Sequence, residues 1–348
     1  HGIDLRLGER AVRIDRAGRR VHTASGLEVD YDTLVLATGS YPFVPPVPGR
    51  DRPGCFVYRT IEDLDAIRAA AAHARTGAVI GGGLLGLEAA KALLRRGLDV
   101  TVVHQFDTLM ERHLDAQAAE FLRSELESRG LKFRMPARTV AILGHERATG
   151  LLFDDGSTLE ADLIVLAVGV RPNIDLARRA GLRCDRGILV NDTLQTFDPS
   201  IYAVGECVQH RDNTFGMVAP LWQQARVCAV HLAESGAFSF TGALPSAHLR
   251  VSGIELYSAG EVEAGEGTQA VMLSDRRRGV YKRLVIRDNR LRGAVLYGDA
   301  ADAPWYLELI TAGRDITSLG DGLLFGRSFV ARDGSVGGEG STANPAHN

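Results

Sequence analysis

This sequence of 348 residues has few cysteines, nearly balanced charges and no long apolar run. Its four cysteines (Cys55, Cys184, Cys207 and Cys228) are far apart and form no CxxC pair, which argues against a disulfide framework, a zinc knuckle or a paired-thiol redox centre. With 40 basic and 43 acidic residues, the net charge of -3 gives no reason to expect binding to nucleic acid or to an anionic membrane. Apolar stretches such as LIVLAVGV (163–170) are too short to cross a bilayer.

Glycine, in contrast, is abundant. The sequence holds 39 glycines, above the usual share of about 7%, which is typical of a fold whose backbone approaches something closely. The chain starts at His1, and no signal or transit peptide precedes the structured pattern. We therefore expect a cytoplasmic protein and a piece of a longer or processed product.

The order of the predicted elements is that of an α/β protein with two or three domains. A short buried strand at 78–80 leads into a glycine turn and a helix within 81–97, and the next strand covers 99–104. Strand, helix and strand in this order imply a parallel sheet with a right-handed crossover. The other predicted elements are a buried strand at 33–37 after a hairpin, helices near 60–74, 114–129 and 220–236, strands near 131–135, 149–153 and 162–169, and a strand within 200–206.

Two stretches separate these elements into domains. The proline-rich segment 41–49 cannot form a helix or a central strand, because its prolines lack N–H donors, and we interpret it as a linker between domains. From about residue 245 short strands and a helix near 303–312 indicate a separate α+β domain. The Gly/Ser/Asn-rich tail at 332–348 is expected to be disordered.

The strongest chemical signal is the pattern Gly81-x-Gly83-x-x-Gly86, which follows a strand and opens a helix. Gly81 permits the tight turn, Gly83 lets the backbone approach a pyrophosphate, and Gly86 allows close packing of helix and strand. The phosphates would then lie at the positive end of the helix dipole. In this setting the pattern predicts a dinucleotide site rather than a merely glycine-rich turn.

The acidic residue that usually accompanies this fingerprint is absent. About 20 residues on, where a carboxylate would bind the adenosine ribose, the sequence has His104. A histidine could donate to a ribose 2′-hydroxyl or, when protonated, pair with a 2′-phosphate; alternatively, it merely ends a strand. The choice between NADH and NADPH is therefore open.

Three further strand ends carry glycine: Thr38-Gly39, Gly169 and Gly205-Glu206. The first two are either places where the chain passes a bound dinucleotide or ordinary turns. The third puts a carboxylate at the edge of a sheet where ligands bind in α/β folds, and there it could accept hydrogen bonds from a ribityl hydroxyl. The helix that opens around Trp222 could stabilise negative charge on a reduced flavin.

Together these segments resemble the FAD/NAD(P)-dependent pyridine nucleotide–disulfide oxidoreductase superfamily, and within it the N-terminal flavin module of assimilatory NAD(P)H nitrite reductase large subunits. The resemblance covers roughly residues 1–326. It is carried by TLVLATGSYPFVPPVPG (33–49), RTIEDLDAI (59–67), VIGGGLLGLEAAKAL (79–93), LMERHLD (109–115), AVGVRPN (167–173), DPSIYAVGECVQHR (198–211), VAPLWQQA (218–225) and YKRLVIRDNRLRGAVLYGDAADAPWY (281–306).

The resemblance implies two Rossmann-like domains, the first incomplete, and a small C-terminal α+β domain. The implied divisions are an FAD-binding domain over 1–58 and 186–240, an NAD(P)-binding domain over 59–185, an interface domain over 245–326 and a flexible tail over 327–348. The family's first βαβ unit, which holds the ADP half of FAD, is missing from this sequence, as are the iron–sulfur and sirohaem modules of full-length nitrite reductases.

The same resemblance assigns cofactor contacts. Thr38 and Gly39 would lie along FAD, Arg59 near its pyrophosphate–ribityl region, Glu206 on the ribityl chain and Trp222 against the isoalloxazine. The residues implied to bind the nicotinamide dinucleotide are Gly81, Gly82, Gly83, Leu84, Leu85, Gly86, His104 and Gly169. Glu88 could approach the nicotinamide, or could be a solvated or capping glutamate. Cys207 is more simply a small buried residue than a redox thiol, since no partner cysteine is near it in sequence.

The expected function is an FAD-dependent NAD(P)H oxidoreductase module that passes electrons through FAD to a redox acceptor protein or to fused iron–sulfur and sirohaem modules. We expect no dedicated catalytic side chain and no metal ligand, because the cofactors carry the chemistry. Two alternatives stay open: a stand-alone ferredoxin or rubredoxin reductase, and a non-catalytic NAD(P)-binding protein with an incomplete flavin site. The C-terminal domain makes a homodimer plausible.

Overall fold

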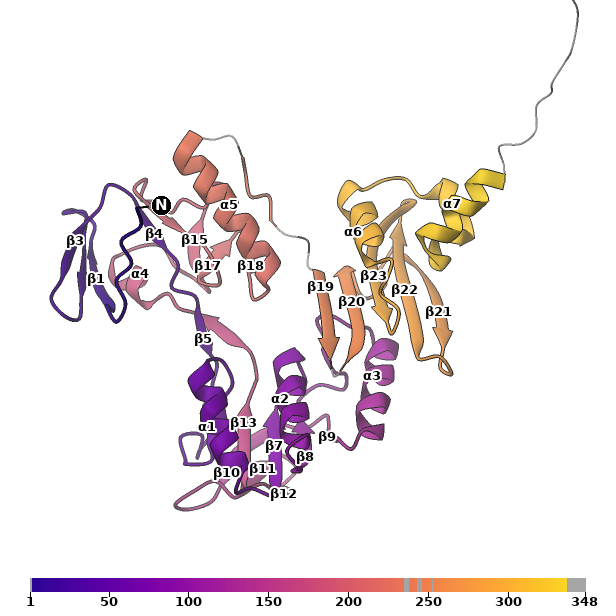
Figure 1. The fold of residues 1–348 in the computed structure, drawn as a ribbon, viewed down its shortest axis with the longest axis horizontal. Coiled ribbons are helices and arrows are strands. Elements are labelled where there is room, and N and C mark those ends of the chain that lie inside the picture. The colour runs from indigo at the N-terminus through magenta and orange to yellow at the C-terminus, as the bar shows by residue number, and fades with distance from the viewer. Residues whose placement is uncertain (1, 235–237, 243, 245, 252, 337–348) are drawn as a thin grey trace, which may run out of the picture. The chain divides into compact units, whose positions relative to one another are not determined.

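The computed structural model describes residues 2–234, 238–242, 244, 246–251 and 253–336 (Figure 1). The described residues fall into two units. Unit 1 consists of those between 2 and 43 and between 169 and 242, and unit 2 consists of those between 44 and 168 and between 244 and 336. Within this described part no helix is long and apolar enough to span a membrane. The same residues contain no cluster of three or more potential metal ligands from His, Cys, Asp and Glu.

A five-stranded parallel sheet forms the first half of unit 2. Its strands, in spatial order, are β6 (Cys55–Val57), β13 (Leu163–Leu166), β7 (Thr76–Ile80), β8 (Asp99–Val103) and β9 (Lys132–Arg134). The helices between them are α1 (Ile61–Ala71), α2 (Leu84–Leu94) and α3 (Ala116–Ser128). The central strands β7 and β13 are almost continuously apolar because both of their faces are buried. The predicted α/β fold class is confirmed.

A three-stranded antiparallel sheet packs beside this layer and consists of β10 (Thr139–Leu143), β11 (Gly150–Phe153) and β12 (Thr158–Glu160). A turn at Asp155-Gly156 joins its last two strands. Strand β10 was not predicted from the sequence. Its side chains share one core with those of the parallel sheet, including Ile142, Leu151 and Ile164.

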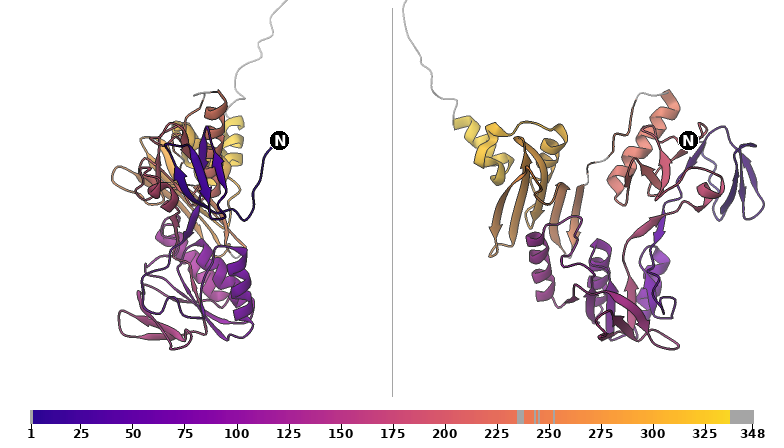
Figure 2. Two further views of the ribbon diagram at one scale, coloured as in Figure 1. Left: turned by 90° about the vertical axis from the view of Figure 1, so that its left-hand side faces the viewer. Right: turned by 180° about the vertical axis from the view of Figure 1, so that it is seen from behind.

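The second half of unit 2 is an antiparallel sheet with the strand order β19 (Ser246–Val251), β20 (Ile254–Gly260), β23 (Arg290–Tyr297), β22 (Val280–Arg287) and β21 (Gln269–Asp275). Helix α6 (Ala303–Ala312) lies against this sheet (Figure 2) and shares its core through Tyr306 and Leu309. Side chains of this half reach α3 of the first half, since Tyr281 donates to the Asp115 carboxylate over 3.0 Å. Because the Asp115 carboxylate also caps α3, this contact ties the two halves together.

The expectation of a flexible tail from residue 327 onward is wrong for its first ten residues. A 3₁₀ segment, η1 (Thr317–Phe325), is followed by helix α7 (Arg327–Val336). Apolar contacts explain this helix, because the Phe329 ring packs 5.1 Å from that of Phe325 and lies over Gly322. Residues 337–348, the rest of the predicted tail, are outside the described residues.

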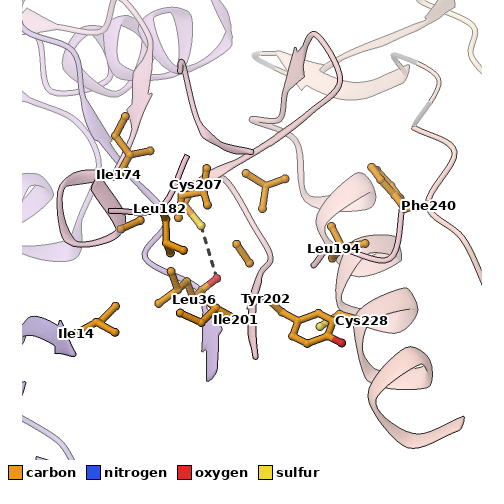
Figure 3. Packing of buried hydrophobic residues seen from close by; sticks show 14 of the residues in the cluster. Ile14, Leu36, Ile174, Leu182, Leu194, Ile201, Tyr202, Cys207, Cys228 and Phe240 are labelled. Atoms are coloured by element: carbon orange, nitrogen blue, oxygen red, sulfur yellow. Dashed lines mark hydrogen bonds between the residues drawn. The ribbon is translucent and has the colours of Figure 1, made fainter. Parts of the chain in front are cut away.

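Unit 1 is built from small sheets around one core. One antiparallel sheet contains β1 (Ala11–Asp15), β2 (Arg20–Thr23) and β3 (Glu28–Asp30). Strand β4 (Leu34–Leu36) pairs in parallel with β16 (Ile201–Ala203). In a third sheet, β15 (Ile188–Val190) pairs in parallel with β17 (Val208–His210), which also pairs with β18 (Asn213–Thr214). The helices are α4 (Asp175–Arg179) and α5 (Val218–Glu234). Figure 3 shows the core that these elements share, with side chains from β4, β16 and α5 converging on it.

The segment interpreted as a linker, 41–49, begins with two residues of a strand. Strand β5 (Ser40–Pro42) pairs antiparallel with β14 (Val170–Pro172) in a sheet of two strands. Proline is tolerated here because each strand has a free edge. The boundary between the units follows directly, between Phe43 and Val44.

Candidate functional site

The glycine loop of unit 2 lies between the end of β7 and the start of α2. Gly81 has a φ of +123°, and a Cβ atom there would lie 2.2 Å from the Ala167 carbonyl oxygen. A Cβ at Gly86 would lie 2.0 Å from the Gly81 carbonyl oxygen. Both positions therefore require glycine because backbone atoms fill the space that a side chain would need.

Gly83 differs from these two glycines because the space around its Cβ position is open. It is the N-cap residue of α2, and no side chain caps the first N–H groups of the helix. Those N–H groups and the helix dipole favour an anion. The loop thus fits a dinucleotide pyrophosphate, because the space beside Gly83, where a phosphate would have to come close, is open.

The structure places His104 beneath the glycine loop, and the ribose contact predicted for it stays a prediction. Its imidazole is only 7% exposed, and its Nδ1 accepts a hydrogen bond of 3.0 Å from the Gly82 N–H. Its Nε2 lies 3.3 Å from a carboxylate oxygen of Glu111. Both ring nitrogens face protein groups, so the side chain supports the glycine loop from beneath.

The other predicted residues of this unit lie at the first turns of α1 and α2. Leu84 is half-buried and Leu85 is exposed. Glu88 is half-buried and near Tyr58, since its charge adds to burial in raising the pKa of that phenol. Arg59 precedes α1, and its backbone N–H donates to the Asp63 carboxylate.

The flavin residues predicted in unit 1 meet where β4 and β16 end. The Thr38 hydroxyl donates to the Asn173 carbonyl oxygen over 2.6 Å, and the Asn173 N–H donates to the Gly39 carbonyl oxygen. Gly39 has a φ of +64°, with open space at its Cβ position. The Ser40 hydroxyl donates to the Glu206 carboxylate over 2.8 Å. Thr38, Gly39 and Glu206 are therefore neighbours, as predicted for residues of one site.

The turn before Glu206 is held by helix α5. The Gly205 N–H donates to the side-chain oxygen of Gln224 over 2.8 Å, and Gln224 is completely buried. Trp222, two residues earlier, is 73% exposed. The helix starts at Val218, two residues before its predicted start. The exposed Trp222 indole is therefore an apolar surface that a flat ring could cover.

Gly169 was grouped with the dinucleotide loop, but the structure places it in unit 1. Its carbonyl oxygen accepts from the Phe43 N–H over 2.9 Å, next to the β5–β14 pair. The reason is the course of the chain, because the segment after β13 leaves the parallel sheet and enters the other unit at this residue.

Cys207 is a core residue. It is fully buried, and its thiol donates to the Val204 and Leu36 carbonyl oxygens, the second of which is drawn in Figure 3. Burial raises the pKa of this thiol above its ordinary value. A buried, protonated thiol is a poor nucleophile, which favours the structural interpretation.

Three residues of these sites escaped the sequence reasoning: Met110, Glu111 and Gln224. Met110 and Glu111 lie in the segment LMERHLD, and Gln224 lies in VAPLWQQA. Both segments carry the family resemblance, but the resemblance assigns no role to these three positions. A carboxylate near the end of β8 was expected, and LMERHLD contains one at Glu111. No pattern in the sequence marks Gln224 as buried.

Known proteins resemble this chain in sequence and in fold. The family model described as pyridine nucleotide-disulphide oxidoreductase matches residues 1–229. This chain belongs to that family. A second family model, described as the rubredoxin NAD+ reductase C-terminal domain, matches residues 245–314.

Two individual relatives support the same assignment. The chain is 44% identical over 317 residues to the assimilatory nitrate reductase electron transfer subunit of Bacillus subtilis, covering 91% of this chain and 41% of that protein. It is 41% identical over 331 residues to the nitrite reductase (NADH) large subunit of Escherichia coli, covering 93% of this chain and 39% of that protein. The chain thus spans about two fifths of these relatives.

Among solved structures, a ferredoxin reductase from Rhodopseudomonas palustris is similar with a TM-score of 0.84 and 28% identity, over 94% of this chain and 81% of that chain. The sequence prediction of the family and of the reductase fold is confirmed by these matches.

Proposed function

We propose that this chain is an FAD-dependent NAD(P)H oxidoreductase module, which carries electrons from a nicotinamide dinucleotide through FAD to a redox acceptor. The observation that carries the proposal is the glycine loop, blocked by backbone at Gly81 and Gly86 but open at Gly83, in front of an uncapped helix. Membership of the pyridine nucleotide-disulphide oxidoreductase family supports it.

In this function the side chains bind and orient rather than react. When bound, FAD supplies the acceptor for a hydride and the ability to release electrons singly. The glycine loop and α2 hold the pyrophosphate of the nicotinamide dinucleotide. Thr38 and Gly39 would keep the backbone beside β4 in position, and the Glu206 carboxylate would accept hydrogen bonds from ribityl hydroxyls. The exposed Trp222 indole would pack on the isoalloxazine. No general base is required.

The electron acceptor is proposed from the relatives' names. Relatives at 44% and 41% identity are an electron transfer subunit of nitrate reductase and a nitrite reductase subunit. We propose the same setting for this chain: a reductase module whose acceptor is either a separate redox protein or iron–sulfur and sirohaem domains fused to it. A cytoplasmic location and a homodimer formed through the C-terminal domain belong to the same proposal. The cysteines, all unpaired in the structure, are compatible with a reducing compartment.

A second candidate is a stand-alone ferredoxin or rubredoxin reductase. It is favoured by the similarity to a ferredoxin reductase structure and by the match to the rubredoxin reductase C-terminal domain over residues 245–314. Steady-state reduction of a ferredoxin, a rubredoxin and nitrite by the full-length natural protein separates the two candidates, because only a nitrite reductase would convert nitrite.

The first test is a visible absorbance spectrum of the purified chain before and after adding FAD, followed by NADH and NADPH. Retained flavin absorption that bleaches with either dinucleotide is the expected result. A protein that binds NADH but never retains FAD would contradict the flavin part of the proposal and favour a non-catalytic nucleotide-binding protein. A protein that binds neither would contradict it entirely.

A further inference from the structure

The segment from His104 to Glu111, which follows strand β8, packs against the glycine loop of unit 2. The Gly82 N–H donates to His104 Nδ1 over 3.0 Å, and the Gly82 carbonyl oxygen accepts from the Met110 N–H over 3.1 Å. Both hydrogen-bonding groups of one loop glycine are thus bound by the same segment. Glu111, the residue after Met110, is thereby placed next to the loop.

The backbone at Met110 explains how the chain turns back. Met110 is buried and has a φ of +53°, in the left-handed region that non-glycine residues rarely adopt. Such a conformation persists only where its surroundings hold it, and it is frequent at functional sites. Here the Met110 N–H bond to Gly82 holds it, and the following residue is directed toward the His104 imidazole.

The hydrogen bond from Gly82 also determines which nitrogen of His104 carries the proton. A backbone N–H can only donate, so Nδ1 is the acceptor and the ring proton is on Nε2. Nε2 is buried, has no aligned hydrogen-bond partner among the described residues, and lies 3.3 Å from the Glu111 carboxylate. The imidazole therefore turns its Nε2–H edge toward the Glu111 carboxylate, which lies beside it.

The rest of the Glu111 carboxylate is available. Its side chain is about one-third exposed, and within the described part of the chain it accepts no hydrogen bond. It lies at the carboxyl end of the strand after the fingerprint, the edge at which an adenosine ribose is bound in a dinucleotide fold. The sequence lacks a carboxylate at position 104, and the structure brings one to that neighbourhood from position 111.

We infer that Glu111 is the residue that recognises the adenosine ribose, positioned by His104, and that it makes the site selective for NADH over NADPH. This inference rests on the proposed function of the glycine loop as a nicotinamide-dinucleotide site. A carboxylate accepts hydrogen bonds from the free 2′-hydroxyl of NADH. The 2′-phosphate of NADPH offers only acceptors and negative charge there, so it is repelled.

The test is the pair of dissociation constants for NADH and NADPH, measured by isothermal titration calorimetry on the full chain. Glu111→Gln keeps the size of the side chain and removes its charge. We expect the NADH preference of this variant to fall at least about tenfold, through weaker NADH binding and tighter NADPH binding. The matched control is Glu160→Gln, the same change at an exposed position on β12, for which the ratio should stay that of the parent.

A second variant addresses the positioning residue. His104→Asn retains an acceptor for the Gly82 N–H but removes the Nε2 donor, so we expect a smaller fall in the same ratio. Circular dichroism melting of every variant checks that the fold is retained, and the ratio of two affinities is insensitive to a partly unfolded fraction. A merely structural histidine would lower both affinities equally.

The outcomes separate this inference from the proposed function. If the parent chain binds neither dinucleotide, the proposed function fails and the inference with it. If the parent binds NADH and Glu111→Gln leaves the NADH/NADPH ratio unchanged, the inference alone is overturned. A parent that prefers NADPH and loses this preference in Arg112→Gln, at the exposed neighbouring position, also overturns it, since the ribose would then be read by a cation.

Discussion

Two glycine turns, one in each unit, are held in the same way and differ in what surrounds them. In unit 2 the Gly82 N–H donates to His104, and in unit 1 the Gly205 N–H donates to Gln224. Both acceptor side chains are buried, and the Nε2 atom of each has no hydrogen-bond partner among the described residues. Each turn follows a parallel strand, so the two units share the same arrangement: a glycine N–H bound by a buried side chain.

The surroundings of the glycines differ. In unit 2, Cβ atoms at Gly81, Gly82 and Gly86 would collide with the backbone or with buried side chains, whereas Gly39 and Gly205 in unit 1 have positive φ and open space. Packing requires glycine at Gly82 and Gly86, packing and torsion together require it at Gly81, and torsion alone requires it at Gly39 and Gly205. A glycine after a buried strand therefore has two physical causes that the sequence does not distinguish, and substitutions separate them.

The largest effect is expected for Gly86→Ala. The new Cβ would lie 2.0 Å from the Gly81 carbonyl oxygen, and because that oxygen is backbone, the strand and helix must separate. We expect the free energy of unfolding to fall by about 3 kcal/mol or more and NADH binding to be lost. Urea unfolding, followed by circular dichroism, measures this free energy. A decrease of less than about 1 kcal/mol would show that helix α2 is not tightly packed on its strand.

Removing the buried acceptors should have the next largest effect. Gln224→Leu and His104→Leu each leave a glycine N–H without its partner, and each should lower the free energy of unfolding by about 2 kcal/mol. Gln223→Leu, at the exposed position next to Gln224, is the control and should change stability little. If the Gln224 and Gln223 variants were equally stable, the Gly205 bond would not hold the turn.

Gly39→Ala tests torsion without a clash. Since its Cβ position is open and its φ is +64°, the only cost is the left-handed conformation, about 1 kcal/mol. Gly39→Asn should recover part of that loss, because asparagine tolerates this region. The same asparagine at Gly86 should recover nothing. Thermal melting of the four variants compares the two causes directly, and recovery at Gly86 would contradict the distinction.

The smallest change in stability is expected for Gly83→Ala, where φ is -83° and the Cβ position is open. The free energy of unfolding should change by only about 0.5 kcal/mol. The NADH dissociation constant should nevertheless rise about tenfold, because the methyl group occupies the space through which a pyrophosphate approaches. Calorimetric titration measures the NADH dissociation constant, and urea unfolding measures the stability of the same variant. A large loss of stability would contradict the prediction, because it would mean that Gly83 is needed for packing.

Much of the fold could be predicted from short segments. The helix predicted near 60–74 is present as α1, and a capping box between Thr60 and Asp63 marks its start. The apolar segment before Gly81 and the helix formers after Gly83 predicted β7 and α2. These predictions succeeded because caps, glycine turns and apolar periodicity act between residues within a few positions of each other.

Other features depend on residues that are remote in sequence. Helix α7 covers the first ten residues of the predicted flexible tail, and its Phe329 ring packs against that of Phe325. The Glu206 carboxylate meets the Ser40 hydroxyl across 166 positions, and His104 reaches Gly82 across 22. No local pattern encodes which side chain will face which glycine.

The sequence by itself determined the α/β class, the glycine fingerprint and the family, because these follow from local backbone requirements and from motifs of fixed spacing. Only the tertiary structure decided that His104 supports the glycine loop, that Gly169 belongs to the other unit, and that Glu111 lies beside His104. Each of these depends on strand register and on a turn at positive φ, which set long-range neighbours through packing and hydrogen bonds that no single segment contains.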